Sequence, residues 1–116
     1  MKIEIKATNL ELTPAIREYA ESKIGSLERF LKRFETNAKL WRGGKSKIEA
    51  FIEIARTAKH HRKGDIFYAE ATLSIGKKIL RAEHSDWNMR VAINKMKEKL
   101  CQEISKYKEK KISNKR

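Results

Sequence analysis

The sequence predicts an α+β domain with the order β-α-β-β-β-α, in which two helices pack on one face of a four-stranded sheet. Four segments alternate apolar and polar side chains, a pattern typical of half-buried strands. Two longer segments repeat apolar residues every three or four positions, a pattern typical of amphipathic helices. Because every strand and helix has one apolar side, we expect the helices to cover one sheet face and leave the other to solvent.

The first strand and the first helix are expected near the N-terminus. Residues Lys2 to Ala7 alternate between charged and apolar side chains. Thr13 is suited to cap a helix, and Pro14 is suited to its first helical position. The apolar stripe continues past Gly25 to Phe34, so we expect this helix to end between residues 33 and 35.

Three further strands are expected at residues 48–55, 66–75 and 79–83. We place one set of alternating residues on the core side: Ile48, Ala50, Ile52, Ile54, Phe67, Ala69, Ala71, Leu73, Ile75, Leu80 and Ala82. The last two strands are joined by a tight turn, in which Gly76 can adopt a positive φ. Residues 36–47 and 56–65 are expected to be loops.

The second helix is expected to begin after a group of capping residues, Ser85, Asp86 and Asn88, and to end near Lys110. Its apolar stripe consists of Met89, Ala92, Ile93, Met96, Leu100, Ile104 and Tyr107. We therefore expect a single domain over residues 1–111 and a short basic tail over residues 112–116.

Positive charge dominates the chain and is unevenly placed. The 116 residues include 28 Lys and Arg against 15 Asp and Glu, a net charge of +13. Residues 89–111 carry eight basic and three acidic side chains, and residues 56–65 carry four and one, whereas the strands at 48–55 and 66–75 are net negative. So basic a domain is typical of proteins that bind a polyanion such as nucleic acid, with an anionic membrane the less frequent partner.

The chain has the features of a cytoplasmic protein. It contains one cysteine and therefore no internal disulfide, and it shows neither a signal peptide nor an apolar run as long as a membrane span. The basic amphipathic second helix could in principle lie on a membrane. Its apolar stripe, however, is what the sheet needs for cover, so we expect no membrane partner.

No pattern in the sequence predicts a catalytic or metal site. The histidines His60, His61 and His84 and the single Cys101 lack the spacing of a structural zinc site. Cys101 lies at the margin of the helical stripe, where an inert, partly buried thiol is expected. Gly43-Gly44 lacks the rest of a phosphate-binding loop. We predict no cofactor, no metal, no small-molecule substrate and no enzymatic activity.

The exposed sheet face is an unfavourable place to bind RNA. Its aromatic residues Phe51 and Tyr68 lie among acidic side chains, which repel phosphates, so base stacking on the sheet is disfavoured. We expect RNA backbone to contact the helices and the basic loops instead.

Several segments together resemble the ribosome hibernation-promoting factor and ribosome-associated inhibitor A family. They are Leu12–Arg17, Leu27–Phe30, Leu80–Glu83, Met89 with Ala92–Asn94, and Leu100 with Lys106–Lys108. The resemblance covers nearly the whole chain, and its order and spacing suit the predicted fold.

The resemblance implies a cytoplasmic protein that binds the small ribosomal subunit and its ribosomal RNA in the channel for messenger and transfer RNA. Residues 1–111 would form the ribosome-binding domain, and translation would be inhibited by occlusion during starvation or stationary phase. Matching of basic positions, together with charge in the loop and at residue 90, gives these candidate RNA-binding residues: Lys23, Arg29, His60, His61, Arg62, Lys63, Arg81, Arg90, Lys99 and Lys106.

The sequence also departs from the family pattern. Arg90 stands where an aromatic residue is common, Cys101-Gln102 replaces a frequent Glu-Arg pair, and Ser26 replaces a frequent lysine. The chain resembles the short type, so we expect no dedicated dimerisation domain. A general double-stranded RNA-binding module of similar architecture remains the alternative, since it would share the basic charge.

Overall fold

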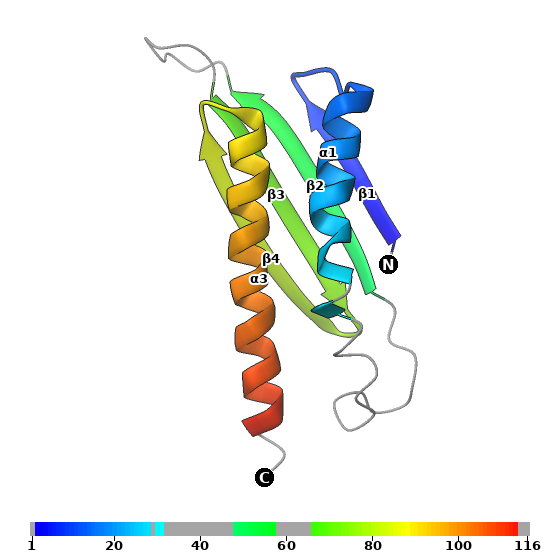
Figure 1. The fold of residues 1–116 in the computed structure, drawn as a ribbon, viewed down its shortest axis with the longest axis vertical. Coiled ribbons are helices and arrows are strands. Elements are labelled where there is room, and N and C mark those ends of the chain that lie inside the picture. The colour runs from blue at the N-terminus through cyan, green and yellow to red at the C-terminus, as the bar shows by residue number, and fades with distance from the viewer. Residues whose placement is uncertain (1, 29, 32–47, 58–65, 114–116) are drawn as a thin grey trace.

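The computed structural model describes residues 2–28, 30–31, 48–57 and 66–113 and shows the predicted element order (Figure 1). The strands are β1 (Lys2–Thr8), β2 (Ile48–Thr57), β3 (Ile66–Ile75) and β4 (Lys78–Asp86), and the helices are α1 (Pro14–Gly25) and α3 (Met89–Ser113). The predicted α+β class and the order β-α-β-β-β-α are confirmed.

The four strands form one mixed sheet in the order β1-β2-β3-β4. β1 runs parallel to β2, and the other two neighbouring pairs are antiparallel. Ile75 pairs with Lys78, so a two-residue turn joins β3 and β4, and Gly76 has the positive φ of 59° expected of it. β1 and β4 are the two edges of the sheet.

Both helices lie on the same face of the sheet (Figure 1). The core between the two layers consists of aliphatic side chains and one methionine. It includes all the residues predicted to face inward on the last three strands except Phe67, which is half-buried. The five central residues of the α3 stripe, Ala92, Ile93, Met96, Leu100 and Ile104, are fully buried. The helix layer therefore has to present its charged residues along its flanks and its outer surface.

The first helix is interrupted at Ser26, whereas its predicted end at residues 33–35 lies outside the described residues. α1 begins after Thr13, whose hydroxyl accepts a hydrogen bond from the Ile16 N–H at 3.2 Å, and it ends at Gly25. The Ser26 hydroxyl donates to the Lys23 carbonyl at 2.6 Å, a local bond that competes with helix continuation. Residues 27–28 and 30–31 are helical again, and Leu27 and Leu31 are buried, so the apolar stripe continues as predicted.

Other boundaries also differ from the prediction. Arg56 and Thr57 belong to β2 and not to the expected loop, because they pair with Phe67 and Ile66. β4 extends to Asp86, and α3 continues to Ser113, past the expected end near Lys110. No helix among the described residues is long and apolar enough to span a membrane.

Candidate nucleic-acid interface

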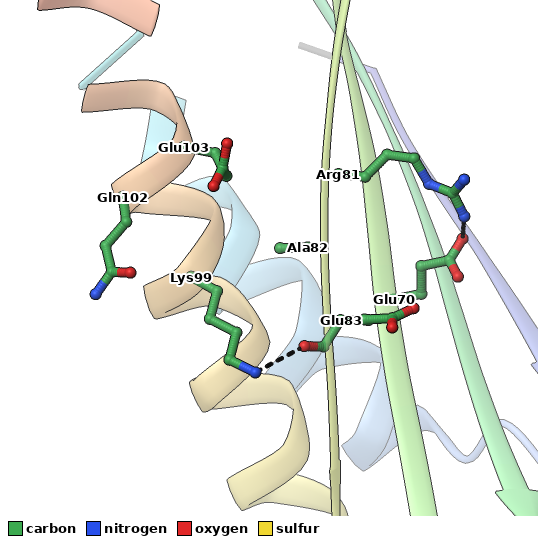
Figure 2. A pocket seen from close by; sticks show the side chains of 7 residues that line it. All are labelled: Glu70, Arg81, Ala82, Glu83, Lys99, Gln102 and Glu103. Carbon is green, nitrogen blue, oxygen red and sulfur yellow. Dashed lines mark hydrogen bonds and ion pairs between the residues drawn. The ribbon is translucent and has the colours of Figure 1, made fainter. Parts of the chain in front are cut away.

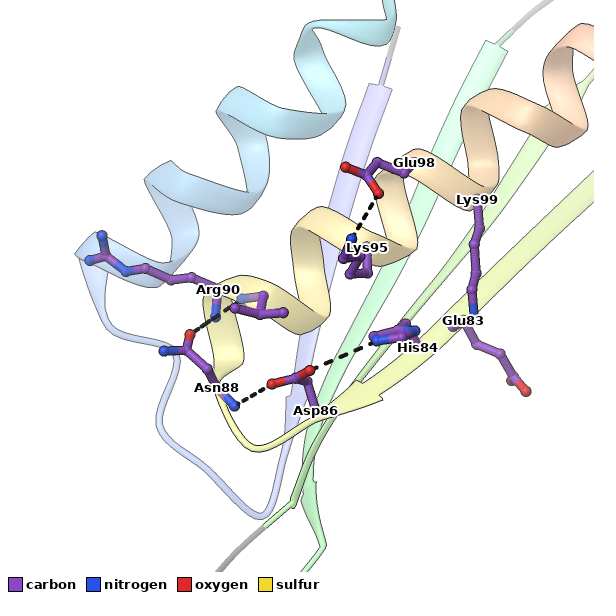
Figure 3. A network of polar contacts seen from close by, with 9 residues as sticks. Glu83, His84, Asp86, Asn88, Arg90, Lys95, Glu98 and Lys99 are labelled. Carbon is purple, nitrogen blue, oxygen red and sulfur yellow. Dashed lines mark hydrogen bonds and ion pairs between the residues drawn. The ribbon is translucent and has the colours of Figure 1, made fainter.

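The α3 helix places its basic residues on two different flanks. The buried stripe faces the sheet, so the side chains just beside it lie either toward α1 or toward β4. Figure 3 shows Arg90 extending toward α1 and Lys99 extending toward β4. The basic residues of α3 therefore form two separate groups.

The first group, which we call the interhelical row, consists of Lys23 from α1 and Arg90, Lys97 and Lys108 from α3. Lys97 follows Arg90 by about two helical turns, and Lys108 follows Lys97 by about three, so all three lie on one flank. The row spans about 27 Å along α3.

Contacts with Tyr19 and Phe30 show that this flank faces the first helix and the helical residues that follow it. The Arg90 guanidinium lies 5.3 Å from the ring centroid of Tyr19, and the Lys108 ammonium lies 5.1 Å from that of Phe30. Cys101 is half-buried, as expected. Burial raises the pKa of its thiol, and nearby Lys97 offsets only part of that rise. A cationic row with aromatic rings beside it is a surface suited to a nucleic-acid backbone.

The second group, which we call the β4-side cluster, consists of Lys78, Lys99 and Lys106. The Lys99 ammonium donates a hydrogen bond to the Glu83 backbone carbonyl at 3.1 Å. Lys78 lies 5.9 Å from the Tyr107 ring, and Lys106 lies 3.7 Å from a Glu103 carboxylate oxygen. Lys99 and Lys106 are therefore partly bonded by the protein itself, so they are less available to a polyanion than the interhelical row.

A hollow of about 590 Å³ lies at the β4 edge of the sheet and is lined by residues of α3, β4 and β3 (Figure 2). Seven residues line it: Glu70, Arg81, Ala82, Glu83, Lys99, Gln102 and Glu103. Its cations are occupied, because Arg81 bonds to Glu70 at 2.7 Å and Lys99 bonds to β4. With three carboxylates against two cations, the hollow is a poor site for phosphate.

The structure divides the candidate residues predicted from the sequence. Lys23 and Arg90 come together through Tyr19, whereas Lys99 and Lys106 lie on the opposite flank of α3. Figure 2 places Arg81 and Lys99 on opposite sides of β4, with Arg81 on the sheet face that the helices do not cover. Arg29 and the loop residues His60, His61, Arg62 and Lys63 lie outside the described residues.

Sequence reasoning did not select Lys97, Lys108 or Tyr19. The first two follow Arg90 at near-integral numbers of helical turns, a signal that the sequence does contain. Tyr19 belongs by its spacing to the apolar stripe of the first helix, and nothing in the sequence indicates which residues of the second helix it contacts.

The uncovered sheet face carries a row of carboxylates. Lys6, Glu53, Glu70 and Glu83 are successive cross-strand neighbours from β1 to β4. The Tyr68 hydroxyl lies 2.5 Å from a Glu70 oxygen and 2.6 Å from a Glu83 oxygen. An aromatic residue held between two carboxylates is a poor platform for RNA bases, since the carboxylates repel phosphates.

No group of three or more His, Cys, Asp or Glu residues that could hold a metal ion is present within residues 2–28, 30–31, 48–57 and 66–113. Of the two groups of cations, the interhelical row is the one whose chemistry suits a polyanion, because aromatic rings lie beside three of its cations and none of the four has an ion pair among the described residues.

Known proteins with similar sequences include ribosome hibernation factors. A ribosome hibernation promotion factor from Picosynechococcus sp. (strain ATCC 27264 / PCC 7002 / PR-6) is 30% identical over 115 residues, which cover 99% of this chain and 53% of that protein. A ribosome hibernation promoting factor from Azotobacter vinelandii is 29% identical over 114 residues, covering 97% of this chain and 87% of the relative. This chain thus spans about half the length of the Picosynechococcus relative.

Two solved structures share the fold. The N-terminal domain of Protein Y from Thermus thermophilus superposes with a TM-score of 0.68 at 21% identity, covering 92% of this chain and 99% of that domain. A ribosomal subunit interface protein from Coxiella burnetii gives a TM-score of 0.70 at 17% identity, covering 93% and 98% of the two chains. The sequence model of the family described as Sigma 54 modulation protein / S30EA ribosomal protein matches residues 3–112, nearly the whole chain, and the protein therefore belongs to this family.

Proposed function

We propose that this protein is a ribosome hibernation factor that binds the small ribosomal subunit in the channel for messenger and transfer RNA and inhibits translation by occlusion. The family and the names of its relatives support a role in ribosome hibernation. The proposal needs no catalysis, metal or cofactor, and it places the protein in the cytoplasm, where ribosomes work.

The interhelical row is the observation that carries this proposal. Lysine and arginine side chains bind phosphates and release counterions, which supplies affinity without reading the base sequence. Specificity would then come from the shape of the RNA channel, because the protein presents a rigid two-layer body with its cations along one helical flank. The carboxylate row on the opposite sheet face would keep RNA to the helix side.

Sedimentation with purified small ribosomal subunits tests the proposal. At low salt we expect the protein to sediment with free subunits, and we expect filling of the channel with messenger and transfer RNA to release it. If no protein sediments with the small subunit, the proposal is wrong.

Competition with duplex RNA separates the proposal from a general double-stranded RNA-binding module. If the protein binds in the channel, free duplex RNA should displace it poorly from the small subunits when duplex and subunits are compared at equal concentrations of RNA phosphate. Equal potency of duplex and subunit would instead favour the general module, because both would then offer the same phosphate contacts.

A further inference from the structure

We infer that Lys23 and Arg90 form one subsite for an RNA backbone phosphate, and that Tyr19 is the residue that positions them. This inference rests on the proposed function and adds a particular ligand group and a particular device to it. Lys23 belongs to the last turn of α1 and Arg90 to the first turn of α3. The two helices start at the same end of the sheet (Figure 1), so Lys23 and Arg90 can serve one phosphate only if a residue between them brings their side chains together.

Tyr19 provides this connection. The Lys23 ammonium lies 5.4 Å from the centroid of the Tyr19 ring, and the Arg90 guanidinium lies 5.3 Å from the same centroid. The Tyr19 hydroxyl also donates a hydrogen bond to the Arg90 backbone carbonyl at 3.3 Å. One half-buried tyrosine therefore contacts the side chain of Lys23 and both the backbone and the side chain of Arg90.

Two cations beside one ring leave a local excess of positive charge. The negative face of the ring offsets only part of it, and among the described residues the structure shows no ion pair for Lys23 or Arg90. The first turn of α3 contains no acidic residue, and its backbone N–H groups add further positive potential. An anion is the partner that this arrangement lacks.

A phosphate suits both cations in shape and charge. A guanidinium can bind two phosphate oxygens side by side, and an ammonium can donate to a third from a different direction. Arg90 is exposed and Lys23 is half-buried, so the phosphate would approach from the solvent side with Tyr19 behind the cations. Tyr19 is a positioning residue in this arrangement, because the cations and not the ring would contact the ligand.

Binding of small ribosomal subunits over a series of salt concentrations tests the inference in the full chain. The variants are Tyr19→Leu, Tyr19→Phe, Lys23→Gln with Arg90→Gln, and the triple variant that adds Tyr19→Leu to that pair. Loss of one phosphate contact should lower the steepness of log affinity against log salt by about 0.7 to 0.9. We expect Tyr19→Leu to weaken binding several-fold and reduce the slope, whereas Tyr19→Phe keeps the ring and should lie close to the unmodified protein.

The decisive comparison is between the Tyr19→Leu effects in the two backgrounds. If Tyr19 acts through the cations, its replacement should change neither affinity nor salt slope once Lys23 and Arg90 are glutamine. An equal loss in both backgrounds, or an unchanged slope in Tyr19→Leu, would overturn the positioning role, and thermal unfolding checks that each variant is folded. Binding by the unmodified protein with no loss in the Lys23/Arg90 pair would refute the subsite alone, whereas absence of binding by the unmodified protein would refute the proposed function.

Discussion

At the scale of single residues, the hydroxyl of Tyr68 links two carboxylates on the uncovered sheet face. The hydroxyl carries one hydrogen, so it donates to only one of Glu70 and Glu83 at a time, although an oxygen of each lies within 2.6 Å. Burial and these two acceptors raise the pKa of Tyr68. The Tyr68 bond, and after it the bond from Arg81, hold the pKa of Glu70 below its ordinary value of 4.5.

This shift predicts an acid-sensitive contribution of Glu70 to stability. A carboxyl group with a lowered folded pKa stabilises the fold fully above its unfolded pKa and loses that stabilisation as pH falls through the folded pKa. Between about pH 5 and about pH 3 the Glu70→Gln variant should therefore lose less stability than the unmodified protein. Thermal unfolding across this range measures the effect. Glu109→Gln, an exposed change on α3, is the control, and equal pH dependence of all three proteins would contradict the assignment to Glu70.

At the scale of elements, α3 depends on an asparagine cap. The Asn88 side-chain oxygen accepts hydrogen bonds from the N–H groups of Arg90 at 2.9 Å and Val91 at 3.3 Å. The Asp86 carboxylate in turn accepts from the Asn88 N–H at 3.0 Å (Figure 3). Of the three capping candidates in the sequence, Asn88 is the cap, because it is the residue that immediately precedes the first helical turn.

Removal of this cap should destabilise the protein measurably. Asn88→Ala leaves two N–H groups at the start of α3 without a side-chain acceptor and should cost about 1 kcal/mol of unfolding free energy. Asn88→Asp keeps an acceptor at the same position and should cost much less. Urea unfolding measures both variants, and an equal loss in Asn88→Ala and Asn88→Asp would show that the capping oxygen is not the cause.

The two flanks of α3 also differ at this scale. The interhelical row contacts Tyr19 of α1 and Phe30 beyond the end of α1, whereas the β4-side cluster is partly bonded to β4 and to α3 itself. The charged residues of a helix with one buried stripe lie on its two flanks and its outer surface, and α3, with 25 residues, is long enough to carry both groups. The neighbours of each flank, and not the helix alone, determine which cations remain available.

At the scale of the whole molecule, the charges are segregated between the two sides of the sheet. The helix layer carries the interhelical row, and the uncovered sheet face carries the Glu53, Glu70 and Glu83 carboxylates. At physiological salt, exposed charges further apart than about 8 Å are largely screened from one another. The two faces can therefore present different potentials to a partner despite the net charge of +13.

This segregation predicts that equal changes in net charge have unequal effects on ribosome binding. Arg90→Gln with Lys97→Gln removes two cations from the helix layer and should lower the salt slope by about 1.4 to 1.8. Lys2→Gln with Lys6→Gln removes two cations from the sheet face and should leave the slope nearly unchanged. Sedimentation with small subunits at several salt concentrations compares the pairs, and equal losses would mean that net charge, not the helix layer, governs binding.

The positions of the elements could be predicted from the sequence, and most of their ends could not. Alternation and helical spacing depend only on which residues are apolar, so the four strands and both apolar stripes could be predicted directly. The turn was predicted from Gly76. The interruption of the first helix at Ser26 was not predicted, because the hydroxyl bond there is a local competition that the apolar stripe does not record. β2 extends through Arg56 and Thr57 because β3 supplies their partners, which polar residues do not reveal in advance.

The sequence by itself determined the fold class, the one-sided sheet and the basic character of the second helix, since these depend on composition and period alone. The family resemblance came from particular residues in matching segments. Only the tertiary structure decided which cations act together. Tyr19 and Arg90 are 71 residues apart and meet because α1 and α3 pack on the same sheet face. The same packing turns Lys99 toward β4 and away from Arg90, since a helix buried on one side has two flanks that face different neighbours.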